Sequence, residues 1–484
     1  MAPSSKSQDS KKLFFDISGT VEYIREHDRF SGIQRVVSVL ITEISKIAPS
    51  EHIFVSWYDK KSGKPYCAPF SSLAENLFSS PQSMRRYFFP LISNQTTLYP
   101  LVRYRDRPFK YYFHRTRLDL ASLFGSAKTL RKYNLTASAW RALRFQKSNK
   151  IVQRDVQDFW NIASPGDLLV LLDLSVHPKH MEFFQKSKDR QLEICSMIYD
   201  LIPISHPHFT SKDTSLRFYD WMREIIELSD RFVAISDSSR RDLLTFQSAH
   251  NAAKDVVTVP LAQAPISLRT KEAMEERPLT KGINTDVFPK VYDLANAEDT
   301  IRGLVGLPFV LCVGPMDQRK NSWRIALAWK HLFEKGHTNL PKLVFAGRLD
   351  PSQLDFKNLL ETTGNLFGHI HVIESPSDET LDLLYRECQF FIMASLYEGW
   401  GLPVGEGLAY GKTGVVAHNS SLPEVGGDFV EYCDAEDVGS IAQAVERVMD
   451  TDHRTDLMAK ISRSNLRSWA EVAQDLKEVL MTET

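Results

Sequence analysis

The chain has 484 residues, 43% of them hydrophobic and 25% charged, with a net charge of −1, a composition typical of a soluble globular protein of two or three domains. Its five cysteines are scattered and never form a CxxC pair, which argues against a zinc or disulfide framework and favours a reducing compartment. The polar N-terminus, and the absence of an apolar run near ~18 residues, predict neither a secretory signal nor a membrane span.

The first 265 residues alternate predicted strands with helix-sized segments. Strands are expected at residues 13–17, 52–58, 168–174, 195–201, 231–235 and 256–261. After the first strand, a loop leads into a helix over residues 33–48, whose apolar positions repeat with helical spacing. This alternation predicts a doubly wound α/β domain.

A strongly basic segment, residues 85–154, interrupts this alternation. It contains 16 Lys and Arg against two acids, with 13 aromatic residues interleaved. One interpretation is a helical insertion with a solvated basic face. A second is a surface for anionic lipid or a lipid-phosphate acceptor, and nucleic-acid binding comes third because no recognised module accompanies the segment.

The second half repeats the α/β pattern. Residues 266–300 are rich in charge and proline and predict an inter-domain linker. A second Rossmann-like domain is expected over residues 301–466, facing the first across a cleft, and a last amphipathic helix over 467–484 is expected to return to the N-terminal domain. Its strands are predicted at 308–314, 342–347, near 371, 390–393 and 415–418, with helices at 321–335, 378–388, 438–449 and 468–481.

Residues 390–412 combine a strand, a glycine-bearing turn and a helix. The apolar run 390–393 predicts a buried parallel strand, and Pro403 and Gly411 mark the start and the end of a helix. Such a unit directs free backbone N–H groups toward an anion at the carboxyl edge of a sheet. Glu398 on the turn and Glu406, expected in the first helical turn, could face one ligand.

Two further loops could contact phosphate. Gly314 ends a strand, and Arg319 and Lys320 then precede a helix, which makes either a diphosphate clamp or a solvated loop. In residues 31–35 (SGIQR), Gly32 and Arg35 could approach a phosphate, although helix capping by the preceding serine explains the same residues.

The segment after the predicted strand 195–201 carries two more candidate residues, Tyr199 and Asp200. His206 and His208 follow in a proline-rich loop, where a histidine pair is more often structural than catalytic. No third ligand at a metal spacing accompanies them, so no zinc site is predicted.

The motifs GPMDQRKN, KLVFAG, DETLDLLYRECQFFIMASLYEGWGLPVGEGLAYGK and SSLPEVGG together resemble the C-terminal domain of retaining, GT-B fold glycosyltransferases of family 4, the group 1 glycosyltransferases. YDLIPISHP, RFVAISDSSRRDL and SGIQRV are similar to the N-terminal domain of that family. Glu398 and Glu406 match the two glutamates of its E-x7-E motif. The resemblance covers both domains except the basic segment and the linker.

This resemblance implies roles for the matching positions. Glu406 holds the nucleotide ribose, Glu398 contacts the donor sugar, and Arg319 and Lys320 neutralise the donor diphosphate without a metal. The further donor-site candidates are Gly399, Trp400, Gly401, Leu402, Gly314, Gly32 and Ser395. The acceptor or accessory candidates are Tyr199, Asp200, Arg35 and Glu424, and Asn419 is a second-line candidate for the lining of the pocket, as Ser395 and Glu424 are.

Some positions depart from the family pattern. Tyr199 stands where the family often has a histidine, so no catalytic histidine is carried over to this loop. Gly405 and Gly407 replace bulkier residues, and each weakens its helix by about 1 kcal/mol at most. Thr413 replaces a common proline.

The resulting expectation is a cytoplasmic, metal-independent retaining enzyme without cofactors that moves a hexose from a nucleotide sugar to a glycan acceptor. A lipid-linked acceptor for surface polysaccharide and a peripheral position on an anionic membrane are part of this hypothesis, and nucleic acid is not an expected partner. A glycosidase-like pair of glutamates is disfavoured, because the cation pair suits a phosphate leaving group. A nucleotide-sugar epimerase, a phosphorylase and a non-catalytic sugar-nucleotide-binding protein remain as alternatives.

Overall fold

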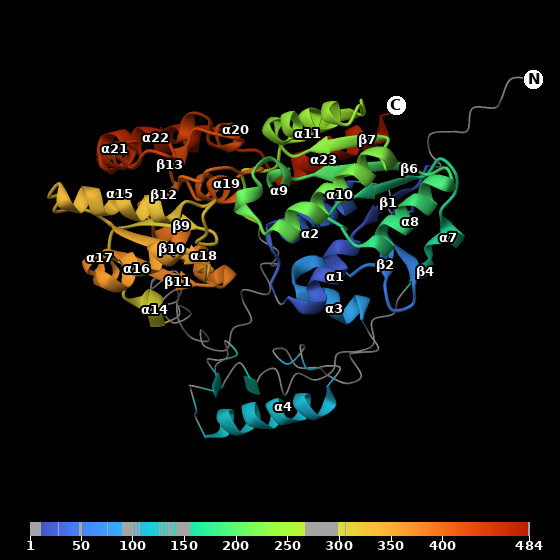
Figure 1. Cartoon of the computed structure of the whole chain (residues 1–484), viewed down its shortest axis with the longest axis horizontal. Helices are drawn as coiled ribbons and strands as arrows, with labels where there is room; N and C mark the ends of the chain where they lie inside the picture. Colours follow the sequence, from blue (N-terminus) through green and yellow to red (C-terminus); the bar gives the residue numbers. More distant parts are fainter. Residues whose placement is uncertain are drawn as a thin grey trace, which may run out of the picture. The chain divides into compact units, whose positions relative to one another are not determined.

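The computed structural model describes residues 11–27, 29–47, 51–74, 76–89, 155–266, 299–304 and 306–482, with parts of 101–141. The chain forms two compact units, residues 1–194 and 195–484. Figure 1 labels the helices and strands along the chain. The expected domain limits at residues 265 and 301 stay a prediction. The expected linker, 266–300, lies outside the described residues except at its ends.

The first unit contains a mixed sheet in the order β4-β3-β2-β1-β5. Its strands are β1 (Leu13–Asp16), β2 (Ile53–Asp59), β3 (Lys64–Pro69), β4 (Gln157–Asp158) and β5 (Leu168–Leu171). The central strand β1 is buried at every position and pairs in parallel with β2 and β5. The strand β3, which the sequence did not predict, pairs antiparallel with β2 along its length and with the short strand β4 only at Tyr66 and Cys67. Pro65 and Pro69 lie outside the pairing with β4, where a proline removes no ladder hydrogen bond on that side.

The first unit contains several described helices, and the first of them lies where the sequence predicted a loop. The helices are α1 (Ser18–Glu26), α2 (Gly32–Ile47), α3 (Pro81–Phe88), α4 (Pro108–Leu123), α7 (Phe159–Ile162) and α8 (Pro178–Asp189). Helix α2 confirms the helix predicted at 33–48. Helix α1 occupies the stretch expected to be a loop, because Asp173 accepts the N–H groups of Gly19 and Thr20 at its start. That capping carboxylate lies about 150 residues away in the sequence, so local sequence did not reveal it.

Three parallel strands come next along the chain, β6 (Glu193–Ile198), β7 (Arg231–Ala234) and β8 (Asp255–Thr258), in the order β6-β7-β8. The helices α9 (Ile202–Ser205), α10 (Lys212–Leu228) and α11 (Asp237–Ala249) connect them. The Ser236 hydroxyl caps α11 by accepting the N–H of Ser239 at 3.0 Å. This arrangement agrees with the strands predicted near 195, 231 and 256.

A second sheet of six parallel strands has the order β11-β10-β9-β12-β13-β14. The strands are β9 (Phe309–Val313), β10 (Lys342–Gly347), β11 (Ile370–Glu374), β12 (Phe390–Met393), β13 (Gly414–Ala417) and β14 (Glu431–Cys433). Its helices are α14 (Asp299–Arg302), α15 (Ser322–Glu334), α16 (Leu354–Thr362), α17 (Gly364–Gly368), α18 (Asp378–Glu387), α19 (Leu402–Ala409), α20 (Leu422–Gly426), α21 (Val438–Met449) and α22 (Thr451–Arg463).

The central strand β9 shows why this sheet is covered on both faces. Val310 and Cys312 pack into one core with side chains of α15, α16 and α21, whereas Phe309 and Leu311 pack into another with α14 and α18. Successive residues of a strand point to opposite faces, so a continuous apolar run is buried on both. The predicted doubly wound α/β fold is confirmed for this sheet.

The last helix, α23 (Trp469–Met481), is fixed at both ends by polar contacts. Ser468 and Glu471 form a capping box at its start. At its end, the Arg231 guanidinium of β7 donates to the carbonyls of Val479, Leu480 and Thr482, each at 2.8 Å. These carbonyls have no partner within a helix, so the buried guanidinium satisfies them and complements the negative end of the helix dipole.

Candidate functional site

The turn between β12 and α19 is built by close backbone packing. Gly401 adopts φ +106°, and a Cβ at this position would lie 2.7 Å from the Leu422 side chain. A Cβ on Gly399 would lie 2.4 Å from the Tyr199 carbonyl oxygen. No side chain caps the start of α19, so its first N–H groups are directed toward the turn.

Two cations and a carboxylate meet at this turn. Arg319 Nη1 lies 2.6 Å from Glu398 Oε2, and Lys320 Nζ lies 2.7 Å from Glu398 Oε1. Arg319 Nη1 also donates to the Tyr397 carbonyl oxygen at 2.9 Å. The structure thus brings together the residues that the sequence assigned to a phosphate clamp and to a sugar contact.

Burial and the neighbouring charges set the protonation states of Glu398 and Lys320. Burial alone would raise the pKa of Glu398, but Arg319 and Lys320 outweigh it and lower that pKa to about 2. Burial lowers the pKa of Lys320, and the Glu398 carboxylate opposes that shift. Glu398 is therefore a carboxylate at neutral pH, and the three side chains carry a net positive charge that favours an anionic ligand.

The positions of the two cations follow from their loop. Gly314 directly follows β9 with φ +137°, and a Cβ there would lie 3.2 Å from Lys320 Cε, so glycine leaves room for the lysine side chain. Asn321 adopts the left-handed conformation, and its side chain donates to the carbonyls of Ala394 and Ala435. Helix α15 then starts without a side-chain cap, beside the two cations. Such a start can stabilise an anion, and its contact with a donor diphosphate stays a prediction.

Glu406 is buried at the fifth position of α19, just beyond the first turn where the sequence placed it. Its Oε2 accepts the Tyr385 hydroxyl of α18 at 3.0 Å. Tyr385 was not predicted to belong to the site, and only the packing of α18 beside this helix reveals it. The hydrogen bond holds the carboxylate in one orientation, and its expected contact with a ribose stays a prediction.

Two serines in the loop after β13 form hydrogen bonds with the backbone of the glycine turn. Ser420 Oγ accepts the N–H of Glu398 at 3.0 Å, and Ser421 Oγ donates to the carbonyls of Glu398 and Trp400 at 2.9 Å. These two serines were missed as site residues, although they follow Asn419 directly in the sequence. Asn419 donates to the carbonyl of Ser395 at 3.1 Å.

Two predicted residues differ in their availability to a ligand. Ser395 is fully buried, and among the described residues its hydroxyl has no hydrogen-bond partner, while its contact with a ligand stays a prediction. Glu424 already accepts the N–H groups of Asp237 and Ser238 at 2.8 and 2.9 Å. Its carboxylate therefore stabilises the start of α11, and burial raises its pKa.

The first two turns of α11 also support the glycine turn. The Tyr397 hydroxyl donates to Asp242 at 2.7 Å, and burial together with this bond raises the pKa of Tyr397 to about 12. The Ser239 hydroxyl donates to the Tyr199 carbonyl at 2.8 Å. The His206 ring packs 4.2 Å from the Tyr397 ring, which is a structural role for this histidine. Asp242 was not singled out in the sequence, because only the tertiary structure shows its contact.

The accessory candidates Tyr199 and Asp200 lie beside this turn. Tyr199 is buried, and Asp200 Oδ1 accepts the N–H of Ile202 at 3.0 Å. Burial raises the pKa of Asp200, while the Arg319 charge lowers it and the Glu398 charge raises it again. Asp200 is therefore electrostatically coupled to the cation pair.

The two unexpected glycines of α19 have a packing cause. A Cβ on Gly407 would lie 2.3 Å from the ring of Phe391, and a Cβ on Gly405 would lie 3.0 Å from the backbone of Gln263. Close packing around the helix compensates for its lower intrinsic stability. Thr413 donates its hydroxyl to the Phe429 carbonyl, a bond that the expected proline could not make.

The predicted residues Gly32 and Arg35 lie in the first unit, in the first turn of α2. Their part in phosphate binding stays a prediction. The Ser31 hydroxyl donates to the Gln34 side chain, and the Ser31 carbonyl accepts the Arg35 N–H at 3.0 Å, so the start of this helix is ordered by local bonds.

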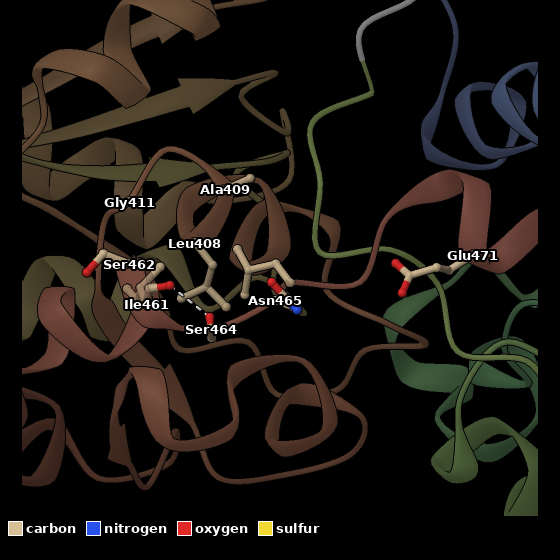
Figure 2. A pocket seen from close by; sticks show the side chains of 9 residues that line it. Leu408, Ala409, Gly411, Ile461, Ser462, Ser464, Asn465 and Glu471 are labelled. Atoms are coloured by element: carbon tan, nitrogen blue, oxygen red, sulfur yellow. Dashed lines mark hydrogen bonds between the residues drawn. The ribbon is translucent and has the colours of Figure 1, made fainter.

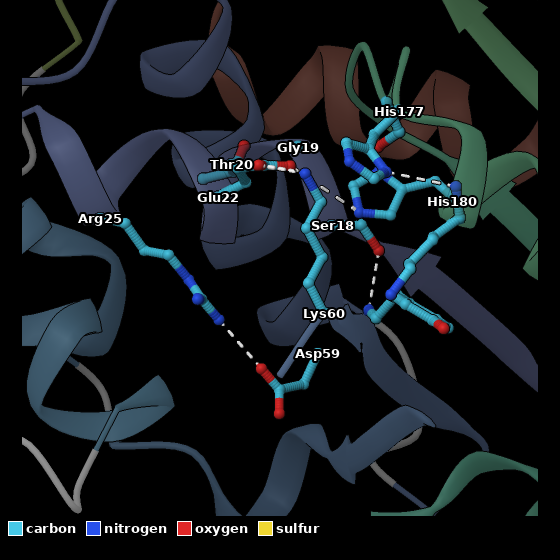
Figure 3. Close-up of polar contacts among 12 residues, drawn as sticks. Ser18, Gly19, Thr20, Glu22, Arg25, Asp59, Lys60, His177 and His180 are labelled. Atoms are coloured by element: carbon cyan, nitrogen blue, oxygen red, sulfur yellow. Dashed lines mark hydrogen bonds and ion pairs between the residues drawn. The ribbon is translucent and has the colours of Figure 1, made fainter. Parts of the chain in front are cut away.

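A second polar cluster lies at the carboxyl ends of the first-unit strands (Figure 3). Lys60 pairs with Glu22, and Arg25 pairs with Asp59 at 2.9 Å. His180 is buried beside them, and neither of its ring nitrogens has a hydrogen-bond partner within the described part of the chain. Burial lowers its pKa to about 3, so the ring is neutral. The sequence did not predict this cluster.

A hollow of about 520 Å³ lies at the opposite end of α19 from the glycine turn (Figure 2). Its lining includes hydroxyl and amide side chains and one acid, Glu471, but no cation. The Glu471 carboxylate already accepts the N–H and the hydroxyl of Ser468, each at 2.7 Å. The hollow therefore lacks the positive groups that a diphosphate requires.

The structure also bears on two other expectations. All five cysteines are buried and free. In the described ranges, no group of three or more His, Cys, Asp or Glu is arranged to hold a metal ion, and the expectation of a metal-independent reaction stays a prediction. In the same ranges, no helix is long and apolar enough to cross a bilayer.

Comparison with known proteins identifies the part of the chain that carries the cation pair and the two glutamates. Residues 301–465 match the family model described as glycosyl transferases group 1. Over these residues the chain is thus similar to the group 1 glycosyltransferases. The E-x7-E turn, the cation pair and α19 all lie inside the matched residues, as the sequence resemblance implied.

Curated relatives of the chain are mannosyltransferases of Escherichia coli. The serotype-specific mannosyltransferase WbdA is 22% identical over 288 residues, which are 59% of this chain and 33% of WbdA. The O-antigen chain mannosyltransferase B is 30% identical over 163 residues, which are 33% of this chain and 42% of that protein. The chain thus spans about a third of the length of WbdA.

Two solved structures share the fold over nearly the whole chain. Anabaena HepE in complex with UDP and glucose aligns with a TM-score of 0.52 at 12% identity, covering 97% of this chain and 99% of HepE. The E. coli protein described as trehalose-6-phosphate bound with UDP-2-fluoro glucose also gives a TM-score of 0.52 at 12% identity, covering 98% and 100%. The predicted GT-B fold is confirmed.

Proposed function

We propose that the chain is a retaining glycosyltransferase that moves a hexose from a nucleotide-sugar donor to a glycan acceptor. The observation that carries this proposal is the buried group of Arg319, Lys320 and Glu398 beside the starts of α15 and α19. Two cations and two uncapped helix starts suit a diphosphate, and the adjacent carboxylate suits sugar hydroxyls.

The proposed chemistry assigns each group a task. The bond between the anomeric carbon and the diphosphate oxygen breaks, and the acceptor oxygen bonds to that carbon on the same face. The acceptor proton passes to the departing phosphate oxygen. Arg319 and Lys320 stabilise the negative charge that develops on the leaving group, without a metal ion. Glu398 lies where it can orient the sugar, and Glu406 where it can bind the ribose.

The names of the relatives indicate which sugar the donor carries and which kind of glycan is formed. We infer a mannosyl donor and an acceptor in O-antigen or a related surface polysaccharide, because WbdA and the O-antigen chain mannosyltransferase B are mannosyltransferases. A lipid-linked acceptor, reached from the cytoplasmic side of a membrane, agrees with the 16 cations of residues 85–154.

No described contact supports a non-catalytic binding protein, an epimerase or a phosphorylase over a transferase. The glycine substitutions in α19 suggested a binding protein without activity, but packing against Phe391 and Gln263 explains them. An epimerase or a phosphorylase would use the same cations, and no described contact favours either over transfer.

The test combines donor binding with transfer by the purified chain. Thermal shifts with GDP, UDP, ADP and dTDP identify the base, and transfer from the matching labelled hexose donors is then measured. Loss of one charge-stabilising donor costs about 10²–10³-fold in kcat, which we expect for Arg319→Ala and for Lys320→Ala. The matched control is Lys330→Ala, which removes an exposed lysine of α15 that pairs with Glu334.

Each outcome of this test decides for or against the proposal. Transfer by the wild type and the Lys330 variant, with loss in both site variants and unchanged folding by circular dichroism, would support it. Wild-type rates in Arg319→Ala would refute the assigned chemistry. Donor isomerisation without transfer would identify the protein as an epimerase.

A further inference from the structure

Helix α4 (Pro108–Leu123) has two apolar faces, of which the structure buries one. Leu118, Ala121 and Ser122 are buried, and the first two belong to a small core with Leu101, Leu130, Tyr133 and Trp140. The other face exposes large apolar side chains, with Phe109 92% exposed and Leu123 73% exposed.

The exposed side chains form a continuous stripe. They are Phe109, Tyr112, Phe113, Leu120 and Leu123, followed by Phe124 at the end of the helix. With about 100° between successive residues, these positions fall within about 120° of arc, opposite the buried face. A helix that is apolar on two sides requires a second covering surface, since exposed patches of this kind mark interaction sites.

The stripe also borders a groove. Phe113, Leu120 and Phe124 line it together with Arg117 and Thr116, and its volume is about 420 Å³. The lining is almost entirely apolar apart from the arginine and the hydroxyl groups. An aliphatic chain would bury its surface in such a groove.

Charge decides which partner fits this face. Lys110 and Arg117 are exposed along the stripe, and Arg115 lies 5.9 Å from the ring of Tyr112. The only acid of α4, Asp119, accepts the indole N–H of Trp140 at 2.9 Å. The helix therefore presents cations and apolar rings together, which is the pattern of a helix that lies in the interface of an anionic membrane.

Two other partners fit less well. A second copy of the chain would place like charges against each other, since residues 85–154 contain 16 cations and two acids. Nucleic acid would neutralise the cations but would leave the apolar stripe without a partner.

We propose that the exposed face of α4 inserts its apolar stripe into the headgroup region of an anionic bilayer. This inference goes beyond glycosyl transfer and does not depend on it. It assigns a docking surface to the basic segment and supplies a reason for an acceptor on a lipid carrier.

The experiment is vesicle flotation of the full chain with phosphatidylcholine alone and with added phosphatidylglycerol. The wild type is expected to float only with the anionic vesicles. The variant Phe109→Ser/Phe113→Ser/Leu120→Ser should lose about 100-fold in partition coefficient, because three buried apolar side chains are removed. Lys110→Gln and Arg117→Gln should each lose about 5-fold, and added salt should weaken the binding.

The matched control is Leu354→Ser/Leu216→Ser, which removes two exposed leucines outside the basic segment and should leave flotation unchanged. Equal flotation of the wild type and the triple serine variant would overturn the proposal. So would a concentration-dependent dimer by light scattering that the serine variant abolishes, if the wild type ignores anionic vesicles. Transfer to a water-soluble acceptor should survive in all α4 variants, so a failure of transfer would count against the proposed function alone.

Discussion

Replacing Glu398 by glutamine tests how this site is held together. The change keeps the shape of the side chain but removes the charge that lies 2.6 Å from Arg319 Nη1 and 2.7 Å from Lys320 Nζ. Breaking a buried ion pair costs about 3–5 kcal/mol, and the amide oxygen still accepts one hydrogen bond, so we expect about 3 kcal/mol. For a unit of this size the unfolding midpoint should fall by about 6 °C.

The loss of stability in Glu398→Gln should depend on pH in one direction. The pKa of Glu398 is about 2 in the folded chain, against an ordinary value of 4.5. A carboxylate with a lowered pKa contributes stability above its unfolded value, and this contribution is lost as the pH falls toward the folded value. The gap in stability between the wild type and Glu398→Gln should therefore be full at pH 7 and should narrow as the pH falls below 4.5.

A nucleoside diphosphate should partly restore the variant. Its phosphates offer Arg319 and Lys320 the negative charge that the glutamine lacks, so the ligand should raise the unfolding midpoint of Glu398→Gln more than that of the wild type. Differential scanning fluorimetry with GDP, UDP, ADP and dTDP measures this. The control is Glu334→Gln, whose partner Lys330 is on the surface and which should change stability by less than about 1 kcal/mol.

Two results would refute this reasoning. A variant as stable as the wild type at pH 7 would show that the ion pairs do not hold the turn. Equal stabilisation of both proteins by every diphosphate would show that the ligand does not meet these cations.

Three further changes test supporting contacts. Tyr397→Phe removes the 2.7 Å hydrogen bond to Asp242 and should cost about 1–2 kcal/mol in the free energy of unfolding and raise the KM for the donor about 5-fold, in urea and kinetic assays. Gly407→Ala places a Cβ 2.3 Å from the Phe391 ring and should destabilise by about 1–3 kcal/mol in urea unfolding, although alanine favours helices. Arg231→Met frees three carbonyls at the end of α23 and should speed amide hydrogen exchange there by at least about 10-fold, measured by mass spectrometry.

Each of these changes has its own check. Asp242→Asn in combination with Tyr397→Phe should add little further loss, because the two residues share one bond. Phe391→Leu should recover stability in the Gly407→Ala background, and failure to do so would exclude the clash as the cause. Faster exchange throughout the second unit in Arg231→Met, instead of only in α23, would show that the guanidinium does more than cap one helix.

Much of the fold could be read from the sequence. The parallel strands β9, β10 and β12 are short apolar runs, which a sheet buried on both faces requires. Helices α2, α15 and α21 have apolar positions with helical spacing and lie within one residue of the predicted limits. Strands at or next to the sheet margins, such as β14 and β3, were missed, because they are only partly buried and show little apolar periodicity.

The sequence also placed most of the candidate site. Arg319, Lys320, Glu398 and Glu406 stand in motifs whose spacing puts them at a strand end or a helix start. The sequence assigned the cations to a phosphate and Glu398 to a sugar, but it did not show that the three form one buried ion-paired group. The contribution of Gly32 and Arg35 remains a prediction.

The sequence by itself determined the features that have a local cause. These are the strand and helix periodicity, the glycine turn, and the positive and negative side chains near that turn. What only the tertiary structure decided are contacts across long sequence separations, such as Asp173 at the start of α1, Asp242 on Tyr397 and Tyr385 on Glu406. The same holds for the second apolar face of α4, since its composition is visible in the sequence but its exposure depends on which face the core covers. Local periodicity records burial in general, whereas the partner of each polar or apolar group depends on the packing of distant elements.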